Sequence, residues 1–137
     1  MTAIGHVMIL ASAGSGKTYA LTNRFVRLLA LGAKPERIVA LTFTRKAAGE
    51  FFDEILNKLA RAARDPVYAA QLAGEIGLSE SSSAGFQPAK EGAGRLEAGA
   101  TSADFLKMLR GVADAMHRLR LGTFDGFFAR IARNFPL

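Results

Sequence analysis

Residues 11–18 have the types and spacing of a phosphate-binding loop. They read Ala-Ser-Ala-Gly-Ser-Gly-Lys-Thr, and they lie between an apolar run, Val7–Leu10, and an amphipathic helical pattern. Where a strand, a glycine-rich loop and a helix follow one another, backbone N–H groups and the helix N-terminus can bind a phosphate chain. The usual pattern is G-x-x-x-x-G-K-[ST], and Ala11 stands at its first glycine position. The alternative is an ordinary glycine–serine turn between a strand and a helix.

Two side chains of this loop could do chemistry. Lys17 can reach the β- and γ-phosphates of a nucleotide, and the Thr18 hydroxyl can ligate Mg²⁺. The helix that follows must position both of them. It carries apolar residues on one face at the 3.6-residue period and ends at Gly32, and the spacing predicts core positions for Leu21, Phe25, Leu28 and Leu29.

The next elements predict a strand–helix–strand unit. Residues 38–43 form a continuous apolar run of the kind found in buried parallel strands, so a right-handed crossover is expected. Thr44 is the expected N-cap of a long helix, which Asp65-Pro66 ends. A short helix is predicted over residues 66–78, and the serine- and glycine-rich residues 79–102 predict a mobile loop.

The C-terminal part repeats a pattern seen at residues 41–48. A third amphipathic helix leads to a short strand at residues 121–124, and a last helix is expected from Asp125. Thr42-Phe43 and Thr123-Phe124 each end a predicted strand just before a helix. Because ligands bind beyond the carboxyl ends of parallel strands, both segments and the loop should open on one edge of the sheet. An exposed phenylalanine there can stack on an unpaired base, although a core position is the alternative.

The composition is that of one basic domain. The 137 residues include 50% hydrophobic ones, enough for a core, and the net charge is +6. A positive chain favours an anionic partner such as nucleic acid, although many basic domains bind none. There is no cysteine, so thiolate chemistry and Cys-ligated metal sites are excluded. No segment reaches the length of a membrane span, and a cytoplasmic location is expected.

Three motifs in this order resemble superfamily 1 DNA helicases of the UvrD/Rep/RecB kind. Residues 11–18 are similar to the family's A-x-A-G-S-G-K-T loop, residues 42–48 to its T-F-T-x-K-A-A motif, and residues 123–127 to its T-F-H-[GS]-F element. The long helical stretch between the second and third motifs makes the RecB/AddA helicase–nuclease branch the nearer one. Asp125 stands where histidine is common, and Tyr19 where the UvrD branch has arginine.

The resemblance implies an α/β fold: part of a RecA-like P-loop NTPase domain, with about three parallel strands, flanking helices and a helical insertion. Residues 1–64 would begin the motor domain, 65–120 would form the insertion and 121–137 would return to the motor domain. It further implies ATP hydrolysis coupled to 3′→5′ movement along single-stranded DNA, with unwinding at single-strand/duplex junctions, in recombination or repair. A nuclease or helicase partner protein is also implied.

The resemblance assigns roles residue by residue. Lys17 and Thr18 would be catalytic, with Thr18 holding Mg²⁺. ATP would be bound by Ala13, Gly14, Ser15, Gly16, Lys17, Thr18 and Tyr19. DNA would be contacted by Thr42, Phe43, Thr44, Arg45, Thr123, Phe124 and Asp125. Three roles stay open for Asp125: capping the last helix, bonding a base edge or orienting an arginine.

A complete motor needs an acidic strand end to position Mg²⁺ and water, and the sequence offers no good candidate. Asp53-Glu54 is a false match, because it sits inside a helical pattern. We therefore expect an N-terminal fragment that binds ATP weakly and does not hydrolyse it. Two other classes stay open: a P-loop kinase or nucleotidyl-transfer enzyme, and a non-catalytic DNA-binding module with a relic loop.

Overall fold

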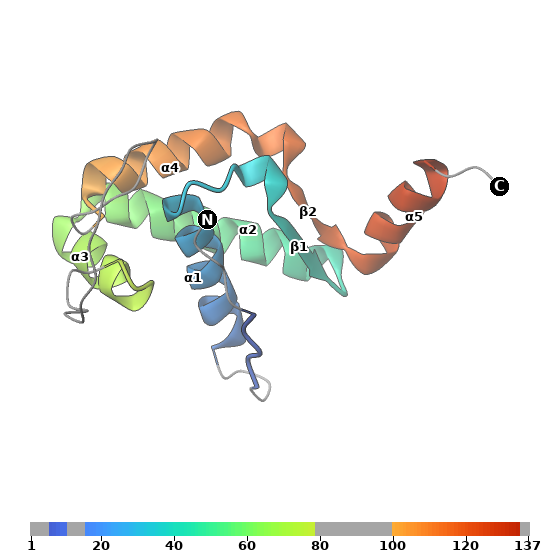
Figure 1. Cartoon of the computed structure of the whole chain (residues 1–137), viewed down its shortest axis with the longest axis horizontal. Helices are drawn as coiled ribbons and strands as arrows, with labels where there is room; N and C mark the ends of the chain where they lie inside the picture. The colour runs from blue at the N-terminus through green and yellow to red at the C-terminus, as the bar shows by residue number, and fades with distance from the viewer. Residues whose placement is uncertain (1–5, 11–15, 79–99, 135–137) are drawn as a thin grey trace, which may run out of the picture.

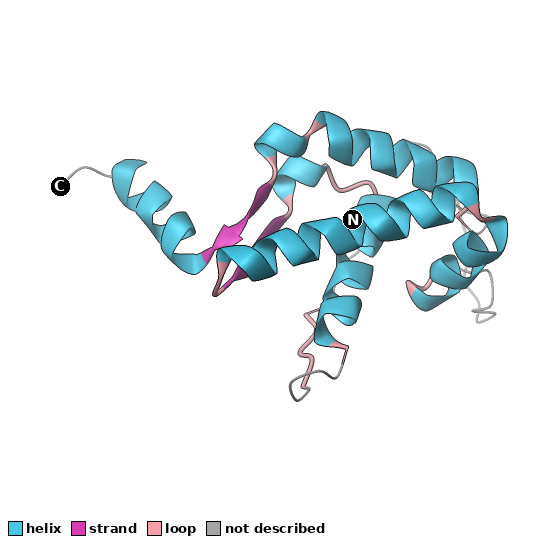
Figure 2. Cartoon of the chain, turned by 180° about the vertical axis from the view of Figure 1, so that it is seen from behind, coloured by secondary structure: helices cyan, strands magenta, loops and turns pink. Residues whose placement is uncertain are grey.

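The computed structural model describes residues 6–10, 16–78 and 100–134, and most of them are helical (Figures 1 and 2). The elements are α1 (Lys17–Ala30), β1 (Val39–Thr42), α2 (Arg45–Arg64), α3 (Pro66–Glu75), α4 (Ser102–Asp114), β2 (Arg120–Thr123) and α5 (Phe124–Asn134). Short 3₁₀ turns, η1 (Pro35–Arg37) and η2 (Met116–Arg118), precede the two strands. The predicted α/β class is confirmed, whereas a RecA-like organisation stays a prediction.

The sheet has two parallel strands in the part of the chain that the structure describes. β1 pairs with β2 in a register that runs from Val39 opposite Arg120 to Thr42 opposite Thr123. The strands predicted at residues 38–43 and 121–124 are therefore present. The strand predicted at Val7–Leu10 is not, since residues 6–10 have no regular structure and pair with neither strand. An apolar run becomes a strand only when a partner completes its ladder.

The strands are less buried than their sequence predicts. Residues 38–43 read as a strand covered on both faces, but Val39 is 43% exposed and the rest of β1 is half-buried. α2 packs against both strands. The continuous apolar run was therefore a poor guide to burial here, because a two-stranded sheet leaves edges and surface open to solvent.

α2 is the central helix, and α1, α3 and α4 all pack against it (Figure 2). Its buried face includes Phe51, Ile55 and Leu59, as the helical spacing predicts. These side chains belong to one core shared by four helices, whose largest fully buried members are Phe105, Ile55, Leu59, Leu72, Val26 and Val112. Asp53-Glu54 lies inside α2, so the structure confirms that it is not an acidic strand end.

The helix boundaries follow from local capping. The Thr44 hydroxyl accepts a hydrogen bond from the Ala47 N–H at 3.1 Å, which confirms Thr44 as the N-cap of α2. Asp65 caps α3 by accepting from two backbone N–H groups. Gly32 ends α1 with φ at 87°, a left-handed conformation that glycine adopts without a Cβ penalty. Side-chain caps therefore set where α2 and α3 begin, and a left-handed glycine backbone sets where α1 ends.

Two further expectations concern the middle and the end of the chain. Residues 79–99 of the predicted loop lie outside the described residues, and its last part differs from the prediction because Ala100 is buried and α4 begins at Ser102. α5 extends away from the other helices (Figure 1). It has no buried residue, and Phe128 and Ile131 are exposed on it. Among the described helices, none is long and apolar enough to cross a bilayer.

Candidate functional site

A glycine with a left-handed backbone stands at the start of α1. Gly16 precedes the helix with φ at 78°, and no atom lies within 4 Å of the position where a Cβ would stand. The left-handed backbone therefore explains the glycine, rather than crowding. Lys17 and Thr18 follow in the first turn with exposed side chains. The predicted contacts at Ala13, Gly14 and Ser15 lie outside the described residues.

Tyr19 is held by neighbours on two other helices. Its hydroxyl donates a hydrogen bond to the Glu75 carboxylate on α3, and the ammonium of Lys58 on α2 lies 3.5 Å from its ring centroid. The bond to Glu75 is the main cause that raises the pKa of Tyr19, and the same bond lowers the pKa of Glu75. Tyr19 is 42% exposed, so part of its ring still faces solvent. Its predicted contact with a nucleotide stays a prediction.

Lys58 is a polar residue that the sequence analysis missed. It is 3% exposed, and its ammonium donates to the Thr22 hydroxyl, the Asn23 side-chain oxygen and the Tyr19 carbonyl. Burial lowers the pKa of Lys58. A signal was present, because Lys58 shares the apolar face of α2 with Ile55 and Leu59. A lysine on such a face needs polar partners from another element.

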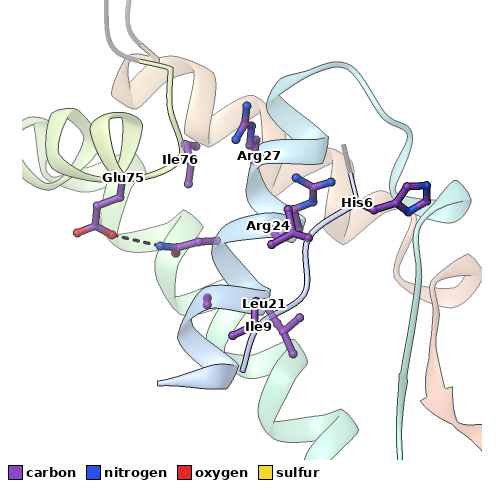
Figure 3. Close-up of a pocket in the computed structure, with 10 residues that line it drawn as sticks. His6, Ile9, Leu21, Arg24, Arg27, Glu75 and Ile76 are labelled. Carbon is purple, nitrogen blue, oxygen red and sulfur yellow. Dashed lines mark hydrogen bonds between the residues drawn. The ribbon is translucent and has the colours of Figure 1, made fainter. Parts of the chain in front are cut away.

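A hollow of about 650 Å³ lies beside α1 (Figure 3). Its walls come from residues 6–10, α1 and the end of α3, and they include His6, Leu21, Arg24, Arg27 and Glu75. Leu21 was predicted to lie in the core, but it is 49% exposed and lines this hollow. The helical period placed Leu21 beside Phe25, yet the packed face of α1 passes instead through Thr22 and Val26. The spacing alone could not fix the edge of the buried stripe.

The second and third predicted segments meet at the carboxyl end of the sheet. Thr42 and Thr123 are direct partners in the parallel ladder. Their neighbours Phe43 and Phe124 therefore lie together, with ring centroids 5.2 Å apart and planes inclined by 40°. Phe43 is 89% exposed and Phe124 is 37% exposed. Both rings were candidates for the core, and the structure places them on the surface as a pair.

Each strand end is followed at once by a helix N-terminus. The hydroxyl of Thr44 caps α2, and the hydroxyl of Thr123 accepts from the Gly126 N–H of α5 at 3.2 Å. α5 begins at Phe124, so the cap is Thr123 and not Asp125, which removes one of the three roles open for Asp125. Asp125 lies exposed in the first turn, where a carboxylate interacts favourably with the helix dipole.

Exposed basic side chains lie on the elements that carry the Phe43–Phe124 pair. Arg45 begins α2 with an exposed side chain. Arg120 and Arg130 line a small hollow of about 120 Å³ between β2 and α5. Exposed cations near an aromatic surface suit a polynucleotide, whose phosphates and bases need both kinds of contact.

The expectation that three sites share one sheet edge is met in part. The Thr42 and Thr123 segments do share it, whereas residues 6–10 do not join the sheet. The start of α1 and the carboxyl ends of both strands nevertheless face the same side of the molecule, the lower side of Figure 1. Within the described residues no group of three or more histidine, aspartate and glutamate side chains could hold a metal ion, so Thr18 stays a predicted ligand.

Known helicases share sequence with part of this chain. ATP-dependent DNA helicase PcrA of Leuconostoc citreum is 49% identical over 55 residues, which are 39% of this chain and 7% of the relative. DNA helicase II of Haemophilus influenzae is 42% identical over 66 residues, 47% of this chain and 9% of the relative. An ATP-dependent helicase/nuclease subunit of Streptococcus pyogenes serotype M5 is 41% identical over 54 residues, 39% of this chain and 4% of the relative.

These aligned segments make up less than a tenth of each relative. No solved structure shows significant similarity to the chain. The family model described as the UvrD/REP helicase N-terminal domain matches residues 2–136. Because that match spans almost all of its 137 residues, the chain belongs to the UvrD/REP helicase N-terminal domain family.

Proposed function

We propose that this chain is the ATP-binding N-terminal part of an ATP-dependent DNA helicase that moves 3′→5′ along single-stranded DNA in recombination or repair. Relatives named as ATP-dependent DNA helicases support the general activity. The direction of movement and the cellular role rest on the motif resemblance alone. As the isolated chain, it binds ATP weakly and does not turn it over.

One observation carries the DNA part of the proposal: the exposed Phe43–Phe124 pair at the ends of two registered parallel strands. Aromatic rings at the surface give unpaired bases a stacking platform. The first turns of α2 and α5 point backbone N–H groups toward the same region, where they can bind phosphates. In this proposal Thr42, Thr44, Arg45, Thr123 and Asp125 border the path of the strand.

The nucleotide part of the proposal rests on the start of α1. Gly16 supplies the left-handed backbone, and Lys17 and Thr18 stand exposed in the first turn. Lys17 would hold the terminal phosphates, and Thr18 would bind the Mg²⁺ that accompanies ATP. When bound, ATP with Mg²⁺ supplies the free energy of phosphoryl transfer, and these residues orient and neutralise its phosphates. Tyr19 and the loop residues Ala13, Gly14 and Ser15 complete the proposed site.

The wider assignment follows the RecB/AddA branch. A relative named as one subunit of a helicase/nuclease supports a partner protein for the parent helicase. We place residues 1–64 and 121–137 in the motor domain, residues 65–120 in a helical insertion, and the parent protein in the cytoplasm. These assignments stand together with the helicase proposal.

Two binding measurements on the 137-residue chain test this proposal. A fluorescent ATP analogue is titrated with the chain and with Lys17→Ala, and a fluorescent oligothymidine is titrated in parallel. We expect Lys17→Ala to abolish nucleotide binding and to leave DNA affinity unchanged at fixed salt. DNA affinity should also fall steeply with salt, because each phosphate contact releases a counterion. Unchanged nucleotide affinity in Lys17→Ala, or a DNA affinity that does not depend on salt concentration, would contradict the proposal.

A further inference from the structure

We propose that Lys58 is a positioning residue for the nucleotide site: it fixes the first turns of α1, and with them Lys17 and Thr18, against α2. This inference rests on the proposed nucleotide site. It deepens that proposal by naming a residue on a different helix, away from all three sequence motifs.

The ammonium of Lys58 directs its hydrogen bonds to one short stretch of α1. It lies 2.6 Å from the Asn23 side-chain oxygen, 2.7 Å from the Thr22 hydroxyl oxygen and 3.1 Å from the Tyr19 carbonyl oxygen. An ammonium carries three N–H donors, so three acceptors match its capacity. All three acceptors lie in residues 19–23, directly after Lys17 and Thr18. The contact is therefore aimed at the phosphate-binding end of the helix.

Neighbouring carboxylates on α3 and on α2 itself support this arrangement. Glu75 on α3 accepts from the Tyr19 hydroxyl and from the Asn23 amide, the latter at 3.2 Å. Glu54 lies 3.9 Å from the Lys58 ammonium and supplies opposite charge. Removing the Lys58 ammonium alone is costly, because its buried partners then lose their hydrogen bonds. The network thus joins α1, α2 and α3 around one point.

The first turn of α1 is little buried. Lys17, Thr18 and Tyr19 are exposed, and the buried residues of the helix begin at Thr22. A helix rises about 1.5 Å per residue, so the Tyr19 carbonyl lies roughly 3 Å along the axis from Lys17. Holding that carbonyl limits the tilt and shift of the turn that presents the phosphate ligands. Displacements of about 1 Å in a binding site are enough to lower binding and rate strongly.

The test compares Lys58→Met with a control of similar stability. Methionine keeps the length and the apolar stem of lysine but removes the ammonium. Val112→Ala, in a fully buried position on α4, weakens the core without touching the network. Both variants are first compared by urea unfolding and then titrated with a fluorescent ATP analogue under conditions where each is folded.

We expect Lys58→Met to bind the analogue about tenfold more weakly, a change of about 1.4 kcal/mol, while Val112→Ala binds like the unmodified chain. Inorganic tripolyphosphate should show the same loss, because the defect lies at the phosphate end. Equal affinity of Lys58→Met and the unmodified chain would overturn the inference. So would an equal loss in Val112→Ala, since the effect would then follow stability alone.

A milder variant covers the case in which Lys58→Met does not fold. Asn23→Ala removes one acceptor of the Lys58 ammonium and one donor to Glu75 from a half-buried position, and we expect about a threefold loss of nucleotide affinity with the fold intact. Unchanged affinity in Asn23→Ala would then count against the inference. Lys17→Ala separates the two proposals. If Lys17→Ala binds nucleotide normally, the proposed nucleotide site is wrong. If Lys17→Ala loses affinity but the Lys58 and Asn23 variants do not, the nucleotide site stands and the proposed role of Lys58 is wrong.

Discussion

Replacing Phe43 by alanine should weaken single-stranded DNA binding with little effect on stability. Phe43 is 89% exposed, so only about a tenth of its surface is buried in the fold. A phenylalanine of roughly 200 Å² therefore contributes about 20 Å² of burial, worth only about 0.5 kcal/mol of unfolding free energy. Stacking of one base on an aromatic ring is worth about 1–3 kcal/mol, which corresponds to a roughly 5- to 150-fold loss of affinity. The binding effect should exceed the stability effect.

The partner ring is a less clean probe. Phe124 is 37% exposed, so close to two thirds of it is buried. Truncating Phe124 to alanine loses on the order of 100 Å² or more of buried surface, which should lower the unfolding free energy by about 3 kcal/mol. A change of DNA affinity in Phe124→Ala would therefore mix stacking with loss of structure. Phe43→Ala separates them.

The assay is fluorescence anisotropy of a labelled oligothymidine at constant salt. Val67→Ala is the matched control, because Val67 is also strongly exposed, at 79%, but lies on α3, away from the strand ends. Phe43→Trp should keep or increase affinity, since tryptophan offers a larger stacking face. If Phe43→Ala binds as tightly as Val67→Ala, the aromatic pair is not a base platform and the reasoning fails.

Three further predictions concern stability. Leu59→Ala should lower the unfolding free energy by about 2–5 kcal/mol, measured by urea denaturation, because Leu59 is fully buried; a loss below about 1 kcal/mol would show a loose core. Asp65→Ala should cost about 1 kcal/mol and lower the melting temperature, since two N–H groups of α3 lose their acceptor, whereas Asp65→Asn should recover most of it. The pKa of Glu75 is lowered from 4.5 in the folded chain, so at a pH near and just below 4.5 the unfolded chain binds more protons than the folded chain. Stability should therefore fall as the pH drops from about 4.5 toward the lower pKa of the folded chain. Urea midpoints between about pH 6 and pH 3 should show a smaller decline in Glu75→Gln, and an unchanged decline would refute the assignment.

Much of the fold could be predicted because it is encoded locally. Thr44 and Asp65 mark the starts of α2 and α3 through their own side-chain hydrogen bonds. Thr42 and Thr123 end the two strands, one residue earlier than predicted, and the parallel ladder brings the two Thr-Phe pairs together. Motif order was also sufficient to identify the family that the residue 2–136 match establishes.

The predictions that failed mostly concern residues whose partners are distant in the chain. Residues 7–10 are as apolar as a strand, but strand formation depends on a neighbour that the local pattern does not specify. Leu21 lies at the margin of the apolar face of α1, and only the packing of α2 decides which margin is covered. Lys58 sits on a predicted core face, and its partners at residues 19–23 belong to another helix. For Asp125, the capping role alone is removed, because α5 starts one residue earlier than expected.

The length of α2 has a structural consequence. This helix of 20 residues starts after the Thr44 cap, next to the aromatic pair. It places Lys58 about 20 Å further along its axis, where the ammonium donates a hydrogen bond to α1. The proposed DNA-contacting strand ends and the proposed nucleotide site would therefore be connected through a single helix.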